Sequence, residues 1–550
     1  MKRNRFLTFA LSAMLLASTL FSTSCGGGGI ASLPDIGERE QESVDKNRTQ
    51  LYVGNYNGGI GEAWLWEAKE LFEQDHKDVQ IMIDNGKDEY GTSSLMSNIK
   101  SNRQDMYVVD SVAYYTLANA GHLADLTEIV TKGEDSIEKR MNPSLRDYYK
   151  TKNGKYYAVP FFEAFYSMTY DVDLFDEYLL WLNEEGTDFV TSLDEPRFKG
   201  IGGEKDAWDE GLPRTYTQFF KLLDKMVSNG ITPLTWSGKF KDTYLKYFTN
   251  GIIADYMGSD YIGNYTFNGK AKTLKRYDFA EPATGTFSLP SDVYEEKTYE
   301  FSDAEGTLAN SAAKYYATKF SKDIMSGGNR YVNQLTITST SESHLMAQST
   351  FLRSRYKGSP IGMLIDGGWW YNEAAVTMDS MSSEYGKEWG KTERRFGVMP
   401  IPKADDGSSA EGHTFSANGN SCVFVSAYSK KQELAKEFFE FIHTREAMSR
   451  FTKTSWCFRP YEYVISESDL KAMPYYIQNI YKCTKSSDVI FTVPKSSSET
   501  ALIQGVDSLA NMMGSKIGSD SYGLPLLAFF ENKDLSVIDY FKGIKDNKIL

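Results

Sequence analysis

The chain is poor in the residues that build metal sites and disulfide frameworks. It holds 4 cysteines and 5 histidines among 550 residues. Cys25, Cys422, Cys457 and Cys483 are widely spaced, without a Cys-x-x-Cys pair, and no two histidines stand three or four positions apart. Zinc and other histidine-based sites need ligands at such close spacing, so we expect no metal and no cofactor. Cys457 and Cys483 could form a bridge in an oxidising compartment, and three buried free thiols are the alternative.

Basic charge and long apolar runs are also scarce. The 60 Lys and Arg residues are outnumbered by 74 Asp and Glu residues, which gives a net charge of −14. An acidic protein is repelled by nucleic acid and by anionic lipid, so neither is expected as a ligand. After the first 24 residues, no segment approaches the ~20 consecutive apolar residues that a membrane helix needs. The length allows two or more domains of ~100–200 residues, and we expect two lobes.

The start of the chain has the pattern of an export signal. Three basic residues precede an apolar stretch from 6 to 21 that is too short and too polar to span a bilayer. Two small residues precede Cys25 and four glycines follow it, which resembles a bacterial lipoprotein cleavage site, with Ser22 where an aliphatic residue is usual. The resemblance implies a signal peptide at 1–24 and a lipidated Cys25 on a flexible stalk at 25–49. Ordinary secretion with cleavage nearby is the alternative.

Aromatic residues are abundant, at 14% of the chain, with 36 tyrosines, 32 phenylalanines and 9 tryptophans. Several tryptophans and tyrosines lie next to glycine, asparagine or aspartate in the sequence. Such rings present a flat apolar face and a polar edge to a ligand. Phenylalanines at helical spacing, in contrast, indicate core packing.

The first part of the chain alternates strands and helices, which predicts an α/β lobe. Strands are expected at 51–54, 79–83 and 106–109, each followed by a helical pattern. Open α/β sheets bind ligands beyond the carboxyl ends of their strands. Two expected loops lie there, one with Asn55, Tyr56 and Asn57, the other with Asp110. Gly58, Gly59 and Gly61 fit neither a dinucleotide nor a Walker spacing, so a loop that lines the ligand with backbone is the better interpretation.

The rest of the chain continues the α/β pattern, with two polar, weakly periodic stretches that we interpret as insertions, at 184–211 and 265–305. Helices are expected around 216–229, at 311–325 and around 432–442, and strands at 361–365 and 396–403. A strand is also expected within 416–430, and a mostly helical tail follows it.

Several motifs follow one another in a recognisable order. They are ANAGHLADLTEIV (118–130), GKYYAVPFFEAFYSMTYDVDLF (154–175), LPRTYTQFF (212–220), NGITPLTWSG (229–238), MLIDGGWW (363–370) and SKKQELAKEFFEFI (429–442). This order resembles family 1 extracellular solute-binding proteins of ABC importers, the oligosaccharide-binding group that includes maltose-binding protein. Asp171, Tyr216 and Gln218 depart from the family's usual Asn, Trp and Glu.

The resemblance implies a two-lobed periplasmic-binding-protein-like fold of type II, with a helical C-terminal tail and a hinge near Glu163 and Tyr166 that lets the lobes close on a ligand. The lobes are expected at 50–164 plus 410–450 for lobe one, and at 165–409 plus 451–550 for lobe two.

The candidate site follows from the same motifs. Trp369 is the strongest candidate for stacking on a sugar, followed by Trp370, although one of this pair should be plain core. Trp236 is a weaker candidate, with core packing as the alternative. The polar candidates are Asn55, Asn57, Asp110, Glu163 and Asp366, and then Tyr56, Tyr166, Asn418 and Asn420. Each polar side chain could instead cap a helix or satisfy a turn. Arg459 could contact the ligand or form an exposed salt bridge.

The implied function is the capture subunit of an importer. It would bind a carbohydrate, as an oligosaccharide, work as a monomer without catalysis, and dock with an ABC permease that cytoplasmic ATPases drive. The lipid on Cys25 would hold it at the outer face of the cytoplasmic membrane. An exported glycoside hydrolase that uses Glu163 and Asp366 is an alternative. Further alternatives are a binding protein for a non-sugar solute such as a peptide, and a surface adhesin.

Overall fold

A computed structural model describes most of the chain beyond its leader. The described residues are 43–56, 58–86, 88–110, 112–200, 207–241, 243–245, 251–252, 255, 272–277, 294–299, 312–326, 330–405, 412–418 and 421–491, with 516–517, 520–521, 534 and 537. Cys25, Asn57, Asn420 and the side chain of Asn418, all named above, lie outside them. None of the helices within these ranges is both long and apolar enough to cross a membrane.

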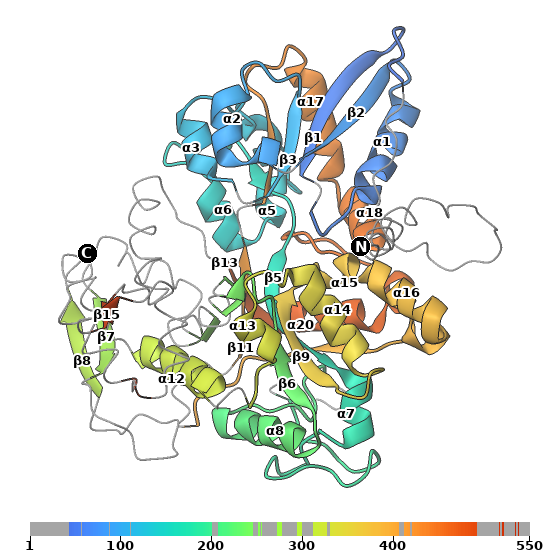
Figure 1. Cartoon of the computed structure of the whole chain (residues 1–550). Helices are drawn as coiled ribbons and strands as arrows, with labels where there is room; N and C mark the ends of the chain where they lie inside the picture. Colours follow the sequence, from blue (N-terminus) through green and yellow to red (C-terminus); the bar gives the residue numbers. More distant parts are fainter. Residues whose placement is uncertain are drawn as a thin grey trace, which may run out of the picture. The chain divides into compact units, whose positions relative to one another are not determined.

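Lobe one is built on a five-stranded sheet of order β2-β1-β3-β12-β4 (Figure 1). Its strands are β1 (Thr49–Tyr56), β2 (Val79–Gly86), β3 (Met106–Val109), β4 (Val159–Pro160) and β12 (Cys422–Val425). The first three are parallel, and β12 runs antiparallel to β3 and β4. All residues of β3 and β12 are buried, as expected for strands that are covered on both faces.

The helices of this lobe surround the sheet, and α1 packs against α17 and α18 from the far end of the sequence. They are α1 (Ala63–Asp75), α2 (Thr92–Asn98), α3 (Tyr114–Asn119), α4 (Thr127–Thr131), α5 (Ile137–Arg140), α6 (Pro143–Tyr149), α17 (Gln432–Ile442) and α18 (Arg445–Ser455), with the 3-10 turn η1 (Asp88–Tyr90).

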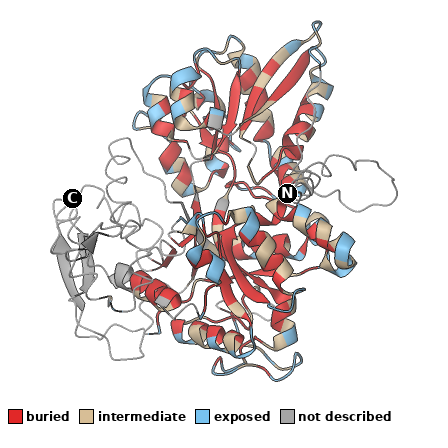
Figure 2. Cartoon of the chain, in the orientation of Figure 1, coloured by how far each residue is buried: buried red, intermediate tan, exposed pale blue. Residues whose placement is uncertain are grey.

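Lobe two has a six-stranded sheet of order β13-β11-β5-β9-β6, with β10 paired to β5. Its strands are β5 (Ala164–Asp171), β6 (Thr232–Thr235), β9 (Ile361–Gly367), β10 (Phe396–Met399), β11 (His413–Asn418) and β13 (Ser487–Phe491). Figure 2 shows that the buried residues concentrate along the strands of both sheets. The two lobes therefore have separate cores.

Helices cover this second sheet, and α8 shows how the sequence places one of them. Thr215 and Gln218 form a reciprocal capping box at its start, and Phe219, Leu222 and Leu223 are buried along one face. The helices are α7 (Val172–Tyr178), α8 (Tyr216–Ser228), α12 (Ala312–Ser326), α13 (Gln334–Thr338), α14 (His344–Ser354), α15 (Trp370–Glu373), α16 (Ala375–Tyr385), α19 (Glu467–Ala472) and α20 (Tyr475–Lys485), with η5 (Lys387–Trp389).

Two antiparallel strand pairs stand outside the main sheets. β7 (Lys272–Tyr277) pairs with β8 (Tyr294–Tyr299), inside the stretch expected to be an insertion at 265–305. β14 (Lys516–Ile517) pairs with β15 (Asp520–Ser521) near the end of the chain.

Three segments carry the chain between the lobes, and hydrogen bonds join them. The first links β4 to β5, the second links β11 to β12, and the third leads from α18 towards α19 and α20. The Phe161 N–H donates to Ser421 O at 2.9 Å, and the Glu163 N–H donates to Phe458 O at 2.8 Å. These crossing segments thus form one connected hinge region, and Glu163 lies within it.

The return to lobe one occurs later in the sequence than expected. Residues 413–418 form β11, which pairs with β5 and β13 in the lobe-two sheet, whereas the sequence predicts that lobe one resumes at 410. Lobe one also extends past 450, because α18 continues to Ser455 and packs on α1. The local sequence does not indicate which lobe a strand or a helix joins, which explains both differences.

The described cysteines do not form a disulfide. Cys422, Cys457 and Cys483 are free and buried. Of the two alternatives that the sequence left open, the structure has three buried free thiols and not a Cys457–Cys483 disulfide.

Candidate ligand-binding site between the lobes

On the lobe-one side, the carboxyl ends of β1 and β2 carry a row of buried polar side chains. Asn55, which is 1% exposed, donates from Nδ2 to Asn85 Oδ1 at 2.9 Å. Asn85 in turn donates to Glu62, which is fully buried at the start of α1. This network ties the two strand ends to the helix that follows. Asn55 therefore supports the loop between β1 and α1, and its amide lies below the surface.

That loop reaches across to lobe two. Gly59 has a φ of +66°, and a Cβ placed on it would lie 3.0 Å from Trp369 Cβ and 3.2 Å from Glu373 Oε1. The half-buried ring of Tyr56 lies close against Gly58. A side chain at Gly59 would be strained by its backbone and would press on lobe two. Glycine here allows close approach of the lobe-one backbone to Trp369.

Trp369 occupies the matching position on lobe two, directly after β9. It is half-buried, and its ring meets the half-buried ring of Tyr166 edge-on, with centroids 5.1 Å apart and planes at 88°. The indole also lies directly against Gly367, where a Cβ would collide with it. The absence of a side chain at Gly367 thus makes room for the ring, and Tyr166 holds it in place. A fixed, partly accessible indole is suited to stacking on the apolar face of a ring-shaped ligand.

Two carboxylates share one amide beside this tryptophan. Gln348 Nε2, on α14, donates to Asp366 Oδ2 at 3.0 Å and to Glu373 Oε2 at 2.8 Å. His344, one turn earlier on the same helix, approaches Glu373 Oε1 with Nε2 at 3.6 Å. Burial raises the pKa of Asp366 to about 7, although hydrogen bonds from Gln348, the Gly367 N–H and Tyr244 favour its ionised form.

Two further expected acids lie at the crossing segments. Glu163 is half-buried in the hinge region, where burial raises its pKa to about 7 against the opposing charge of Lys485. Asp110 is half-buried after β3 and accepts a hydrogen bond from Ser421 Oγ, next to the second crossing segment. Both acids therefore lie at or beside the crossing segments, where a movement of the lobes would change their surroundings.

Trp236 and Trp370 belong to the core, which corrects their place in the expected site. Both are 0% exposed, so neither ring can stack on a ligand here. Trp370 packs against Phe396 and Tyr476, with centroids at 5.3 and 5.4 Å. Trp236 follows β6 and hydrogen-bonds through its backbone to Thr336. Asn418 is the last residue of β11 and pairs with Ala164 at the start of β5.

Arg459 is also placed differently from either expectation. It is 2% exposed, which rules out an exposed salt bridge, and its Nη1 donates to Ile442 O at 3.0 Å.

The structure thus brings together Trp369, Tyr166 and Asp366, and adds Glu373, His344 and Gln348, which the sequence reasoning missed. Glu373 lies within the same GGWWYNEA segment as Trp369, four residues further on, so its spacing was an available signal. His344 and Gln348 stand four apart, on one face of a helix. Nothing in the sequence indicated that this face meets β9. Among the described residues, no group of three or more His, Cys, Asp and Glu side chains could hold a metal ion.

A comparison with known protein families identifies the class of protein to which this chain belongs. The model of the bacterial extracellular solute-binding protein family matches residues 57–449, which is more than half of the chain. The chain belongs to this family, as the order of its motifs predicted. Its members are extracellular, so the protein is exported. No curated protein matches the sequence significantly.

Solved structures confirm the two-lobed fold. Apo RafE from Streptococcus pneumoniae is 15% identical, with a TM-score of 0.51 over 89% of this chain and 99% of that one. Lmo0181 from Listeria monocytogenes, an ABC substrate-binding protein in complex with cycloalternan, is 15% identical, with a TM-score of 0.51 over 91% and 98%. A chitin oligosaccharide binding protein is 14% identical, with a TM-score of 0.54 over 92% and 99%. At such low identity these structures establish the fold alone.

Proposed function

We propose that this protein captures a carbohydrate between its lobes, near Trp369, and delivers it to an ABC permease. The observation that carries the proposal is the approach of the Gly59 loop of lobe one to Trp369 and Glu373 of lobe two. A sugar offers C–H faces to an aromatic ring and hydroxyls to short polar side chains. Trp369 supplies the ring, while Glu373 and His344 supply polar atoms. Structures with the same fold hold cycloalternan or are named for chitin oligosaccharides, which supports this substrate class.

A thermal-shift screen tests the substrate class. A ligand present at 100 times its Kd should add about 2.7 kcal/mol to the free energy of unfolding, which is readily seen as a higher Tm. We expect one or more oligosaccharides to raise the Tm and peptides to leave it unchanged. If peptides raise it and no sugar does, the assigned substrate class is wrong.

Replacement of the proposed platform should remove the response. In Trp369→Ala the stacking face is lost, and we expect an affinity for the identified sugar at least tenfold lower, measured by calorimetry. Trp389→Ala is the matched control, because Trp389 is also half-buried but packs against Tyr356, with centroids 5.5 Å apart. Equal loss in both variants would show that the effect is general destabilisation.

We further propose that Cys25 carries the lipid that keeps the protein beside its permease. A capture subunit is useful only near its transporter, and the leader pattern around Cys25 provides an attachment point. In Cys25→Ala we expect the protein to move from the membrane fraction to the medium or periplasm, detected by fractionation and immunoblotting. Retention in the membrane fraction would contradict the anchor while leaving the sugar proposal untouched.

A glycoside hydrolase is the second candidate, on one observation. Burial raises the pKa of both Glu163 and Asp366 to about 7, as an acid catalyst working at neutral pH requires. The family supports binding instead. Incubation with oligosaccharides, followed by chromatography, separates the two candidates. We expect the sugars to be recovered intact, and any shortened product would favour hydrolysis.

A further inference from the structure

A cavity of about 490 Å³ opens where the crossing segments meet the two lobes. From lobe one it is lined by the end of α5 and the start of α6, and from lobe two by the end of α20. The crossing segments contribute Glu163 and residues 458–463. Apart from Glu163, none of the residues assigned to the sugar site lines it. The cavity is therefore a separate feature of the molecule.

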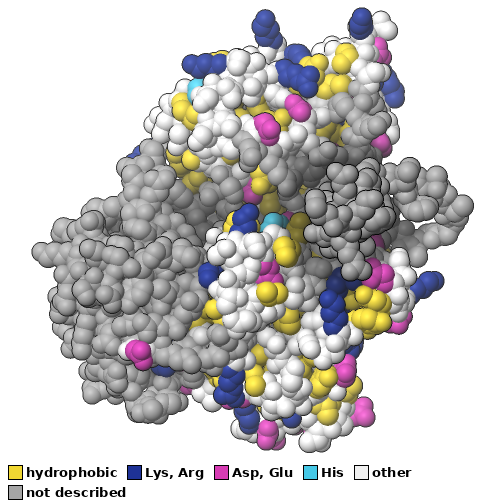
Figure 3. All heavy atoms as spheres, in the orientation of Figure 1, with side chains coloured by type: hydrophobic (Ala, Val, Ile, Leu, Met, Phe, Trp, Pro, Cys, Tyr) yellow, Lys and Arg dark blue, Asp and Glu magenta, His cyan; other side chains and the backbone are white. Residues whose placement is uncertain are grey.

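Its lining is basic, in a protein with a net charge of −14. Five cationic side chains face two carboxylates. The cations are Lys139, Arg140, Arg146, Arg459 and Lys485, and the carboxylates are Glu163 and Glu462. Figure 3 shows Lys and Arg interspersed with Asp and Glu over the described part of one face. The lining of the cavity, in contrast, has a clear excess of cations.

Few of these cations have a carboxylate partner. Arg140 Nε lies 3.7 Å from Asp135, and Arg146 Nε lies 3.5 Å from Asp147, and both of these acids are 60% exposed. Within the part of the chain that the structure describes, no ion pair is formed by Lys139, Lys485 or Arg459. Lys139 and Lys485 are exposed and come from opposite lobes.

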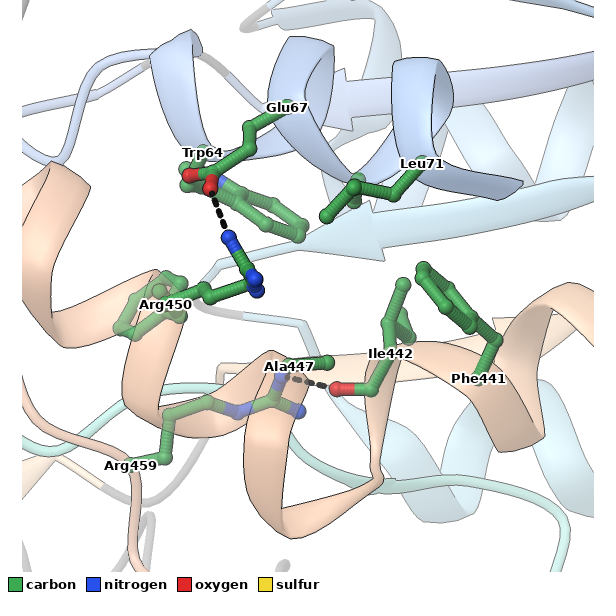
Figure 4. Close-up of a pocket in the computed structure, with 10 residues that line it drawn as sticks. Trp64, Glu67, Leu71, Phe441, Ile442, Ala447, Arg450 and Arg459 are labelled. Carbon is green, nitrogen blue, oxygen red and sulfur yellow. Dashed lines mark hydrogen bonds and ion pairs between the residues drawn. The ribbon is translucent and has the colours of Figure 1, made fainter. Parts of the chain in front are cut away.

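Arg459 is the most confined of the group. Figure 4, which draws another pocket that Arg459 also lines, shows its guanidinium beside the Ile442 carbonyl. Its central carbon lies 5.1 Å from the ring centroid of Phe161 and 5.5 Å from that of Phe451. Burial lowers its pKa to about 10, partly opposed by Tyr461 and Tyr463. Arg140 is 6% exposed and donates to the His443 carbonyl at 2.8 Å. Arg140 has only the exposed Asp135 as a carboxylate partner, and Arg459 forms no ion pair with the described residues. Such poorly compensated buried cations are costly, and a nearby anion would offset that cost.

We propose that this cavity binds a small oxyanion, a molecule that carries a phosphate or carboxylate group, held between Lys139 of lobe one and Lys485 of lobe two above the buried Arg140 and Arg459. A volume of this size suits a molecule of sugar or citrate dimensions rather than a lone phosphate ion. Because the lining comes from both lobes and from the crossing segments, the bound anion links the lobes at the hinge region. The inference does not depend on the identity of the sugar ligand.

Calorimetry with defined probes tests the site. The probes are glucose 6-phosphate, glucuronate, citrate and inorganic phosphate, with uncharged glucose for comparison. We expect saturable binding of at least one organic anion, weakened by added salt. A stronger response to glucose 6-phosphate than to glucuronate and citrate would identify a phosphate group, and the reverse a carboxylate. No saturation by any organic anion up to 10 mM, or equally weak binding of all anions, means an adventitious ion only and overturns the proposal.

Variants locate the binding. Lys139→Gln combined with Lys485→Gln should lower the affinity for the best probe at least tenfold. Lys482→Gln is the matched control, since Lys482 is exposed on the same last turn of α20 but does not line the cavity. Trp369→Ala should keep the anion response, which separates failure of this site from failure of the sugar site. Unchanged affinity in the double variant would place the anion elsewhere and overturn the assignment.

Discussion

At the scale of single residues, Asp171 shows how one departure from the family motif is accommodated. The family's crossover motif usually carries Asn at this position. Here the carboxylate accepts from the Leu174 N–H at 3.1 Å, which caps α7, and from Arg394 Nη2 at 2.5 Å. Both partners of the ion pair are 2% exposed, and Arg355 lies 3.6 Å away. The cap needs only an acceptor oxygen, but the buried guanidinium needs the charge.

Asp171→Asn should therefore keep the cap and lose the charge. A buried ion pair with one partner removed leaves an uncompensated charge, so we expect the free energy of unfolding to fall by about 3 kcal/mol. Urea unfolding followed by circular dichroism measures this. Lys471→Gln is the control, because the Lys471–Glu467 pair is 71% and 82% exposed and should contribute less than about 1 kcal/mol. Equal midpoints for the two variants would show that Arg394 does not need its partner.

At the scale of elements, the turn between β1 and α1 couples the framework of lobe one to the proposed site. The Asn55–Asn85–Glu62 network fixes where β1 ends and α1 begins. The glycines between them then bring the backbone against Trp369 and Glu373. Neither the network nor the contact alone would define a ligand loop. Together they give a hydrogen-bonded base and, at Gly59, a backbone surface that faces Trp369 without a side chain.

A comparison of Gly59 with Gly121 separates the loss of stability caused by backbone strain from any loss of sugar binding. Gly59 and Gly121 have φ values of +66° and +70°, but only at Gly59 would a Cβ meet other atoms within 4 Å. Alanine at either position should cost about 1–2 kcal/mol of stability from the left-handed backbone. We expect only Gly59→Ala to weaken sugar binding as well, measured by calorimetry. Similar affinities in the two variants would place the ligand away from the Gly59 loop.

Most helices and strands could be predicted from the sequence, whereas the sheet or core that each of them joins could not. The expected strand at 106–109 coincides with β3, because its four apolar residues stand between Asp105 and Asp110, which mark its two ends. The residues of β11 lie in lobe two rather than in the predicted lobe one, since nothing in their sequence indicates which sheet they join. The sequence likewise left open whether Trp236 and Trp370 lie in the core or in the site, and both lie in the core. A tryptophan beside a turn can face either side, and only the helix packed against it decides which.

At the scale of the whole molecule, stability should depend on pH through the buried acids. Asp366, which is 2% exposed, ionises near 7 instead of near its ordinary 3.8. Below pH ~4 the carboxyl is protonated in both the folded and the unfolded chain. Between pH ~4 and ~7 the unfolded chain releases this proton while the folded chain retains it, so stability falls as pH rises. The shift corresponds to a loss on the order of 4 kcal/mol by pH 8. Glu163 acts in the same direction.

Asp366→Asn removes this titration while keeping an acceptor oxygen for the Gly367 N–H. We expect the variant to lose less stability than the wild type between pH 5 and pH 8, so that its advantage grows as the pH rises. Urea midpoints at pH 5, 6.5 and 8 measure the difference. Parallel pH profiles for the two proteins would mean that Asp366 ionises at an ordinary pKa in the folded chain.

Because the described thiols are buried, a dye that reports ligand binding can be attached at a single chosen position. Burial raises the pKa of all three described thiols, Cys422, Cys457 and Cys483, to about 12 in the case of Cys457, so thiol reagents should spare them. In a chain without Cys25, a cysteine introduced at Leu345, which is 50% exposed beside His344, would react selectively among the described positions. A fluorescent dye attached there would report binding as a change of emission, which would turn the protein into a reagentless sensor for its own ligand.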